Sequence, residues 1–355
     1  MPAFKIGSRL IGHDQPTYFI ADIAGNHDGS LSRAKELIAL AASVGADCAK
    51  FQHFTAETLV SDAGFKDLGE SRSHQAAWGQ SVFETYKNHE CPIAWVPILA
   101  EFSQKLNIDF LTTPYSLEAL EAADPYVAAY KIGSGDINWF EFLSKIGLKG
   151  KPVILATGAS KACEVKAAAH LLASCGTPLA LLQCNTNYTG SDENFNFLNL
   201  RVLQSYQREY PAAIVGLSDH TPGHVAVLGA VALGGRIIEK HFTDDAARPG
   251  PDHAFSLTPT GWRKMVDDVR RLEAALGEGV KRVEENERET VVLQRRCVRL
   301  KHDLPEGHGL QRDDLVCLRP APEGSLPPWQ APSVLDKKLN NSKKAGDYLI
   351  WADLQ

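Results

Sequence analysis

The chain has 355 residues, enough to bury a large apolar core without disulfides or a structural metal. Its composition, 44% hydrophobic and 23% charged, is ordinary for a globular protein and excludes disorder, collagen and coiled coil. The formal net charge of −6 argues against a nucleic-acid-binding protein, because such proteins neutralise phosphates with excess Lys and Arg. A small anionic substrate stays open, since a local cationic pocket does not require a basic protein.

Cysteine usage and the N-terminal segment both indicate a cytoplasmic protein. The seven cysteines are scattered and never spaced as CxxC, which favours free thiols in a reducing compartment. The N-terminal segment MPAFKIGSRLIGHDQ lacks the apolar core of a signal peptide. The longest apolar run, around residues 225–233, is far too short to span a bilayer, so we expect no membrane partner.

Eight short apolar runs, bounded by Gly, Pro and Asp, recur between residues 18 and 241. Their lack of two-residue alternation is typical of parallel strands that are covered on both faces. The runs are Tyr18–Ala24, Ala46–Phe54, Ile108–Pro114, Val127–Ser134, Pro152–Thr157, Leu179–Asn185, Ala213–Asp219 and Arg236–His241.

Most of these runs are followed by a helical pattern. Apolar residues recur at helical spacing from Leu31 to Ala41, with Ser30 or Ser32 as the cap and Gly45 as the stop. Similar patterns cover residues 116–124, 162–174, 199–209, 224–233 and 261–276. The alternation predicts an α/β fold, a (β/α)8 TIM barrel. A doubly wound sheet is the alternative, but no GxGxxG follows the first run.

The pattern changes after about Leu276, where a charged connector begins. From Gln294 the helical periodicity gives way to short strand-like pieces, turns and prolines. We predict a TIM-barrel domain over residues 1–283, a linker over 284–293 and a small β-rich domain over 294–355. A domain of that size is marginally stable alone and is expected to lean on the barrel or on a partner chain.

Polar side chains stand at the carboxyl ends of the predicted strands, where TIM barrels place their active sites. In chain order they are Asp22, Asn26, His27, Lys50, Gln52, Thr112, Thr113, Lys131, Ser134, Asp136, Thr157, Asn185 to Tyr188, Ser218 to His220 and Glu239 to His241. A purely structural barrel gives no reason for such a ring, so we interpret it as a site.

Within this ring, Lys50 and Lys131 are predicted to bind an anion such as phosphate or carboxylate. Hydroxyl groups would assist them, from Thr113, Ser134 and Ser218. One lysine in a strand is usually an edge residue, but two lysines flanked by apolar residues at strand ends indicate a site. A Schiff-base aldolase is the rival interpretation, because a desolvated barrel lysine can act as a nucleophile.

His220 and His241 end consecutive predicted strands and should be neighbours. Two neutral imidazoles with carboxylate or water ligands suit Mn²⁺, Zn²⁺ or Fe²⁺. Three carboxylates could complete or orient the ligand shell: Asp22, Glu239 and Asp252. His27 is either a third ligand or a general acid or base. Other histidines lack such a position and are expected on the surface, among them His13, His74, His89 and His302.

Seven segments, in chain order, resemble the sialic acid (nonulosonate) synthase family. They are ADIAGNHDGSLSRAKELIALAASVGADCAKFQ, FLTTPYSLEAL, YKIGSGDIN, ILATGAS, GLSDHT, GAVALGGRIIEKHFT and RPGPDHAFSLTP. The C-terminal segment LPEGHGLQRDDLVCLRP resembles that family's antifreeze-like (SAF) domain. One such motif would be weak, but seven in order with a matching appended domain are specific.

The resemblance implies a phosphoenolpyruvate-dependent nonulosonate synthase, a C–C bond-forming transferase of surface polysaccharide biosynthesis. Family members condense phosphoenolpyruvate with a hexosamine-type sugar, N-acetylmannosamine or a 6-deoxy diacetamido relative. The products are phosphate and a nine-carbon 2-keto acid of the sialic, legionaminic or pseudaminic type. The family requires a divalent metal, commonly Mn²⁺, with Mg²⁺ and Co²⁺ as alternatives.

The strand-end ring and the resemblance together define a predicted site. Metal binding is predicted for His220 and His241, and catalytic roles for Asp22, His27, Lys50 and Lys131. Substrate contacts are predicted from Gln52, Thr113, Ser134, Asp136, Asn187, Tyr188, Ser218, Asp252 and Arg319. Arg319 matches a SAF-domain arginine that reaches the sugar's acyl group in the partner subunit's site, which implies a domain-swapped homodimer.

Four positions depart from the family's pattern. Asp22 and Asp136 stand where glutamate is usual, Ala156 replaces a common serine, and Gln183 replaces a frequent histidine. These changes fall at sugar-facing and phosphate-facing positions, so the acceptor sugar stays open, unacylated mannose included. Two other function classes also stay open: another barrel lyase or aldolase, and a catalytically idle sugar-binding homologue.

Overall fold

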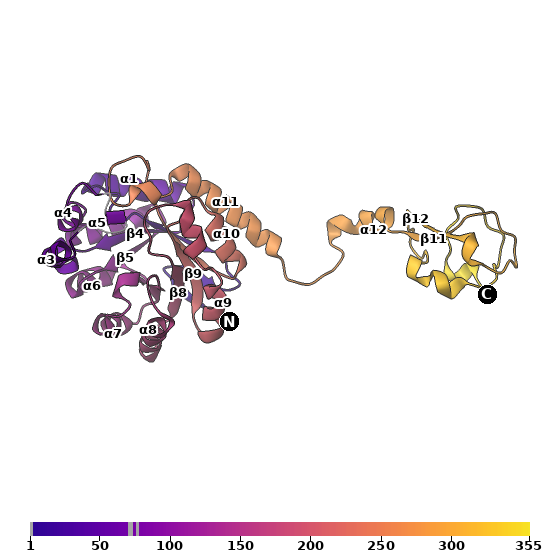
Figure 1. The fold of residues 1–355 in the computed structure, drawn as a ribbon, viewed down its shortest axis with the longest axis horizontal. Helices are drawn as coiled ribbons and strands as arrows, with labels where there is room; N and C mark the ends of the chain where they lie inside the picture. Colours follow the sequence, from indigo (N-terminus) through magenta and orange to yellow (C-terminus); the bar gives the residue numbers. More distant parts are fainter. Residues whose placement is uncertain (1–2, 70–73, 76–77) are drawn as a thin grey trace. The chain divides into compact units, whose positions relative to one another are not determined.

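The structure, a computed structural model, describes residues 3–69, 74–75 and 78–355. It divides into two compact units, Met1–Gly277 and Glu278–Gln355 (Figure 1). The first unit therefore ends six residues before the predicted limit of the barrel domain, because its last helix already stops at Leu276.

Eight parallel strands close into a barrel in the first unit, as predicted. Each strand pairs with the next in the chain, and the last closes on the first, in the order β10-β3-β4-β5-β6-β7-β8-β9. The strands are β3 (Tyr18–Asp22), β4 (Cys48–His53), β5 (Asp109–Pro114), β6 (Tyr130–Ile132), β7 (Val153–Ala156), β8 (Leu179–Cys184), β9 (Ile214–Asp219) and β10 (Ile237–His241). All eight fall inside the predicted runs.

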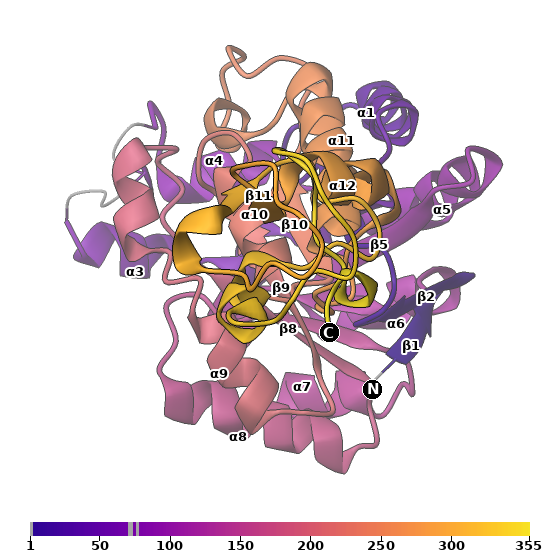
Figure 2. The ribbon, with the colours of Figure 1, turned by 90° about the vertical axis from the view of Figure 1, so that its right-hand side faces the viewer.

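The helices of the first unit lie in the connections between strands, and Figure 2 shows α1, α5, α6, α7 and α8 following one another around the outside of the barrel. They are α1 (Leu31–Ser43), α2 (Ala56–Leu59), α3 (Asp62–Asp67), α4 (Val82–Asn88), α5 (Val96–Lys105), α6 (Leu117–Ala123), α7 (Phe140–Gly147), α8 (Ala162–Ser174), α9 (Val202–Glu209), α10 (Val225–Ala232) and α11 (Pro259–Leu276). The helical patterns of the sequence correspond to α1, α6, α8, α9, α10 and α11. Helix α1 begins as expected, with the Ser30 hydroxyl accepting from the Arg33 amide.

The barrel interior explains why polar groups collect at one end. Side chains two residues apart on a strand point to the same face. The inward positions of the lower barrel are apolar and form one core cluster that includes Ile20, Leu111, Ile154, Ile214 and Ile237. Two residues further along β3, β5 and β10 stand Asp22, Thr113 and Glu239. These polar side chains point into the barrel at the carboxyl ends of the strands, beyond the apolar cluster. That end of the barrel interior is therefore polar.

A hairpin made of β1 (Ala3–Ile6) and β2 (Arg9–Gly12) precedes the barrel. Its Phe4, Ile6 and Ile11 belong to the same core cluster as the lower barrel interior. The hairpin therefore covers the end of the barrel opposite the polar ring.

The second unit has its own apolar core, which includes Val298, Leu310, Val334 and Leu349. Its regular structure is an antiparallel pair, β11 (Cys297–Leu300) with β12 (Leu315–Leu318), supplemented by isolated bridges and short 3-10 turns. The predicted linker over residues 284–293 is helical in part, because α12 spans Arg288–Gln294. The charged composition of this segment did not indicate the short helix, which precedes β11, the first strand of the second unit.

All seven cysteines are free thiols. Within residues 3–69, 74–75 and 78–355, no helix is both long enough and apolar enough to cross a membrane.

Candidate active site

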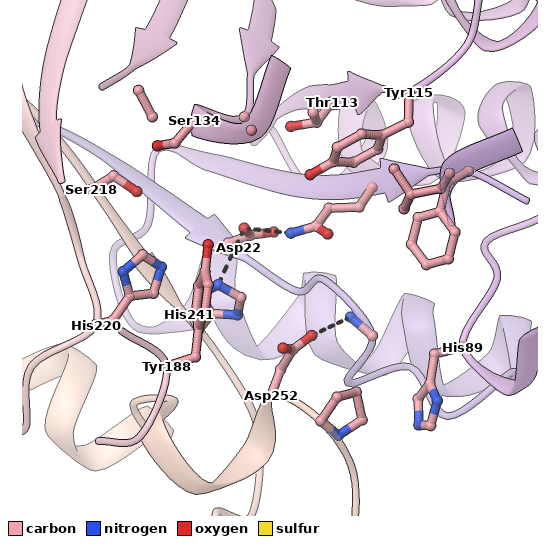
Figure 3. Close-up of a pocket in the computed structure, with 18 of the residues that line it drawn as sticks. Asp22, His89, Thr113, Tyr115, Ser134, Tyr188, Ser218, His220, His241 and Asp252 are labelled. Carbon is pink, nitrogen blue, oxygen red and sulfur yellow. Dashed lines mark hydrogen bonds and ion pairs between the residues drawn. The ribbon is translucent and has the colours of Figure 1, made fainter. Parts of the chain in front are cut away.

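A cavity of about 460 Å³ opens at the carboxyl ends of the barrel strands. It collects twelve of the predicted site residues: Asp22, Lys50, Gln52, Thr113, Lys131, Ser134, Asp136, Tyr188, Ser218, His220, His241 and Asp252. Figure 3 shows His220, His241 and Tyr188 grouped together beside Asp22. The strand-end ring is thus one continuous site.

Three predicted residues do not line this cavity. His27 is fully buried against Phe51 and Trp95, where its Nδ1 accepts from the Gly29 amide. Asn187 turns its carboxamide oxygen to Thr189 and so shapes the loop that carries Tyr188. Arg319 is exposed and belongs to the second unit, just after β12.

Asp22 and Lys50 form a buried ion pair at the floor of the cavity. Lys50 Nζ lies 2.7 Å from Asp22 Oδ2, and each side chain is 2% exposed. Gln52 Nε2 donates to the same oxygen at 3.1 Å. Burial acts to raise the pKa of Asp22, but the charges of Lys50 and His241 outweigh it and hold that pKa at about 2. Asp22 is therefore ionised across the physiological range.

A second buried lysine faces Glu239 across the barrel. Lys131 Nζ lies 3.2 Å from Glu239 Oε1, which also accepts the Ser218 hydroxyl at 3.0 Å. The other oxygen, Glu239 Oε2, is buried without a hydrogen-bond partner among the described residues. Just after β6, the Ser134 hydroxyl accepts from the Gly158 amide at 2.9 Å. Ammonium, hydroxyl and amide groups thus line this half of the cavity.

The two histidines stand side by side, with ring centroids 5.3 Å apart. His220 Nδ1 donates to the Asn185 carbonyl at 3.0 Å, because a carbonyl oxygen can only accept. This bond fixes the tautomer and leaves the lone pair of Nε2 free. Burial and the neighbouring His241 and Lys240 hold the pKa of His220 well below its usual range, so the ring is neutral.

The donor set fits a divalent cation held by two protein ligands. Among the described residues, no group of three or more His, Cys, Asp or Glu side chains is arranged to hold a metal. His220 nevertheless offers a free lone pair, and His241 Nδ1 is buried without a partner while its Nε2 lies 3.7 Å from Asp22. Two imidazoles with oxygen donors from substrate and water suit a Mn²⁺-type ion.

The residues between the site positions point outward and hold β9 and β10 together. Asp219 and Lys240 form a fully buried ion pair, 2.7 Å from Nζ to Oδ2, on the helix side of the strands. The strands also approach closely at Gly216, where a Cβ would lie 2.1 Å from the Ile237 carbonyl oxygen. Only glycine fits there, and this approach brings His220 next to His241.

One wall of the cavity comes from the long connection between β4 and β5, which the sequence analysis left unassigned. Phe54, Tyr86 and Tyr115 meet there in edge-to-face contacts, with centroids 5.5 and 6.0 Å apart. His74 and His89, expected on the surface, line the cavity too. Neither histidine lies at the end of a strand, so their position in the sequence did not indicate that they line the cavity. The unusual length of the connection between β4 and β5 was the one sequence feature that could have indicated it.

Asp136 differs from the other cavity carboxylates. Its Oδ2 is buried without a partner in the described structure. Burial raises the pKa of Asp136 to about 6, against the opposing charge of Lys131. Asp136 is therefore neutral below pH 6 and gains a negative charge beside the predicted anion site above it.

We expect this titration to weaken the binding of phosphoenolpyruvate as pH rises through 6. The KM for phosphoenolpyruvate should rise by about tenfold across that range, because the new carboxylate charge repels the anion. In Asp136→Asn this rise should be absent, because no carboxylate charge appears beside the anion site. The substrate's own phosphate gains negative charge over the same pH range in both proteins, so the difference between the two profiles reports Asp136. Steady-state KM values of both proteins against pH check this, and superimposable profiles would contradict it.

Comparison with known proteins gives one consistent result. A sequence profile described as the NeuB family matches residues 37–281. The N,N'-diacetyllegionaminic acid synthase of Legionella pneumophila is 32% identical, with 98% of each chain covered. The human N-acetylneuraminate-9-phosphate synthase is 31% identical, with 93% of this chain and 90% of that protein covered.

Similarity to solved structures agrees with this result. The crystal structure of N-acetylneuraminic acid (sialic acid) synthetase from Leptospira borgpetersenii, in complex with citrate, superposes with a TM-score of 0.70. It is 30% identical and covers 81% of this chain and 95% of its own. The profile spans most of the barrel, and the full-length relatives extend over both units. The chain therefore belongs to the NeuB family.

Proposed function

We propose that this protein condenses phosphoenolpyruvate with an amino sugar to a nine-carbon 2-keto sugar acid and phosphate. The observation that carries the proposal is one cavity that combines two buried, paired lysines with two adjacent histidines. The relatives described above are named as synthases of nonulosonic acids, and the alignments cover 98% and 93% of this chain. The products of such enzymes supply surface polysaccharides.

Phosphoenolpyruvate binds where Lys50 and Lys131 lie. Both lysines are buried, with 1% and 3% of each residue exposed, so they attract an anion with little screening by water. Further donors stand around them, from Thr113, Ser134 and Ser218. The lysines are already paired with Asp22 and Glu239, so the substrate enters a preorganised network and completes it.

The sugar binds in its open-chain form on the side of Tyr188 and Asp252. C3 of phosphoenolpyruvate forms a bond to the aldehyde carbon, and the aldehyde oxygen takes up a proton. Water then adds at C2 and loses a proton. The bond between C2 and the phosphate oxygen breaks, the new C2 hydroxyl gives its proton to the departing phosphate, and C2 becomes the keto group. Asp22 is ionised, lies next to His241 and accepts a hydrogen bond from Gln52, which suits it to orient the attacking water or the sugar.

A divalent cation, Mn²⁺ by preference, would be held by His220 and His241 and would polarise the aldehyde when bound. Four carboxylates outnumber two lysines among the described lining residues, so added positive charge is electrostatically favourable there; the carboxylates are Asp22, Asp136, Glu239 and Asp252. The neutral imidazole of His220 needs no deprotonation before it binds the cation.

The structure argues against a lysine nucleophile at Lys50. A Schiff-base lysine needs a lowered pKa, so that the amine is neutral. Burial acts to lower the pKa of Lys50, but Asp22 and Glu239 outweigh it and raise that pKa above its ordinary value. Lys50 is therefore a fixed cation, as anion binding requires.

The test is release of inorganic phosphate in mixtures that omit one component at a time. We expect release only when phosphoenolpyruvate, an acceptor sugar and Mn²⁺ are all present. The sugar panel is N-acetylmannosamine, a 2,4-diacetamido-6-deoxy relative and mannose. No release with any sugar would contradict the proposal. A borohydride-trapped keto-acid adduct at Lys50 or Lys131 would instead support an aldolase.

We further propose that the second unit is a SAF domain that completes the site of a partner subunit in a domain-swapped homodimer. The resemblance of residues 304–320 supports this role. Arg319 is exposed and would be free to reach an acylated sugar. The molecular mass of the full chain in solution tests the dimer. Free thiols and a cytosolic co-substrate support a cytoplasmic location.

A further inference from the structure

Asp28 lies outside the cavity but joins both ends of the loop that carries Asp252. Its Oδ2 accepts from Arg248 Nη2 at 2.6 Å, and its Oδ1 accepts from His253 Nε2 at 3.0 Å. Between these contacts the chain runs Pro249, Gly250, Pro251 and Asp252. One carboxylate therefore pins this loop on either side of the residue that faces the cavity.

The turn that holds Asp28 also touches Asp252 directly. The Gly25 amide donates to Asp252 Oδ2 at 3.0 Å, and the Asp28 amide closes the same turn on the Gly25 carbonyl at 3.1 Å. A Cβ at Gly25 would lie 3.2 Å from Asp252 Oδ2, so the two segments are in close contact (Figure 3). The turn after β3 thus sets the position of the Asp252 carboxylate.

Asp28 itself is firmly held. Arg33 Nε lies 3.1 Å from Asp28 Oδ2, while the ends of the same guanidinium bind Asp244 at 2.8 and 2.5 Å. His253 is fully buried, and its Nδ1 contacts the Thr243 hydroxyl at 2.7 Å. The network links α1, the segment after β10 and the loop, so Asp28 is tied to the loop through contacts that are themselves held in place.

We propose that Asp28 is a positioning residue for sugar recognition, which acts through His253 and Arg248 to fix the Asp252 carboxylate. This inference rests on the proposed function, in which Asp252 contacts the sugar. Phosphoenolpyruvate binds at Lys50 and Lys131, which this network does not reach. Loss of Asp28 should therefore affect one substrate and spare the other.

The test variant is Asp28→Asn. Asp28 has φ +50°, a left-handed conformation that asparagine tolerates as well as aspartate does, so the backbone is not strained. The variant removes the charge that binds Arg248 and His253. We expect the KM for the sugar to rise about tenfold, with the KM for phosphoenolpyruvate unchanged. Amide hydrogen exchange over residues 245–253 should become faster.

Asp268→Asn is the matched control. Asp268 also accepts from a histidine, His224 Nε2 at 2.9 Å, and from two cations, Lys264 and Arg271. It lies on α11 and does not line the cavity. The control should lose a similar set of contacts and leave both KM values unchanged.

A double-mutant cycle separates positioning from general destabilisation. Asp252→Asn alone should raise the sugar KM, and adding Asp28→Asn should raise it no further, because Asp28 acts only through Asp252. Additive effects, or an equal rise in both KM values, would overturn the proposal. If the wild-type protein releases phosphate with no sugar, the proposed function fails. Unchanged exchange over residues 245–253 in Asp28→Asn would separately overturn the positioning role.

Discussion

Replacing His220 and His241 together by alanine is expected to reduce Mn²⁺-dependent phosphate release by about 10³-fold or more. The two rings are adjacent, with centroids 5.3 Å apart, and both line the cavity. In the proposed function they are the protein ligands of the cation. The double variant should also lose Mn²⁺ binding measured by calorimetry. Removal of the metal from the wild-type protein with a chelator should give the same loss of activity, and added Mn²⁺ should restore it.

His224→Ala is the control for this experiment. His224 is half-buried beside Asp268 on the outside of the barrel, and it does not line the cavity. Its loss should leave Mn²⁺ affinity and phosphate release at wild-type values. Full Mn²⁺ affinity in the His220→Ala, His241→Ala double variant would place the metal elsewhere and remove the basis of the proposed site.

The positions of most site residues could be predicted because a parallel barrel converts chain order into spatial order. For example, His220 directly follows β9 and His241 ends β10, and these strands are neighbours in both sequence and space. Successive residues of a strand point to opposite faces. In the motif SDHT, Ser218 and His220 therefore face the cavity, whereas Asp219 points outward and is buried under the helices. That division follows from two-residue periodicity once the strand bounds are known.

The sequence could not show which residues of the long loops fold back to the cavity. His27 lies five residues after the end of β3, and the turn there directs it against Phe51 and Trp95 rather than into the cavity. His89 lies 67 residues beyond Asp22 in the chain and still lines the same cavity, because the connection between β4 and β5 folds back over the barrel mouth. Such placements depend on tertiary contacts that no local pattern encodes.

Replacing Lys50 by methionine is expected to abolish activity and to lower the free energy of unfolding by about 3–5 kcal/mol, because it leaves Asp22 as an unpaired buried charge. The double variant Asp22→Asn, Lys50→Met has no buried charge at this pair and should recover most of that stability. It should not recover activity, since the anion site still lacks its cation. Urea denaturation and phosphate release measure the two effects separately.

The pH dependence of stability gives an independent check with a definite sign. In the wild type the pKa of Asp22 is about 2, below its ordinary 3.8, so the ion pair stabilises the fold above pH 3.8 and this contribution is lost as pH falls towards 2. Without Lys50, burial dominates and raises that pKa. The stability difference between wild type and Lys50→Met should therefore be largest near neutral pH and shrink as pH is lowered.

Lys66→Met provides the reference for an ordinary ion pair. Lys66 binds Asp62 at 2.6 Å, but its side chain is 69% exposed, so the variant should leave the free energy of unfolding close to the wild-type value. A Lys50→Met variant that behaves like Lys66→Met would mean that water reaches Asp22. In that case the low-dielectric environment on which both anion binding and the low pKa of Asp22 depend would not exist.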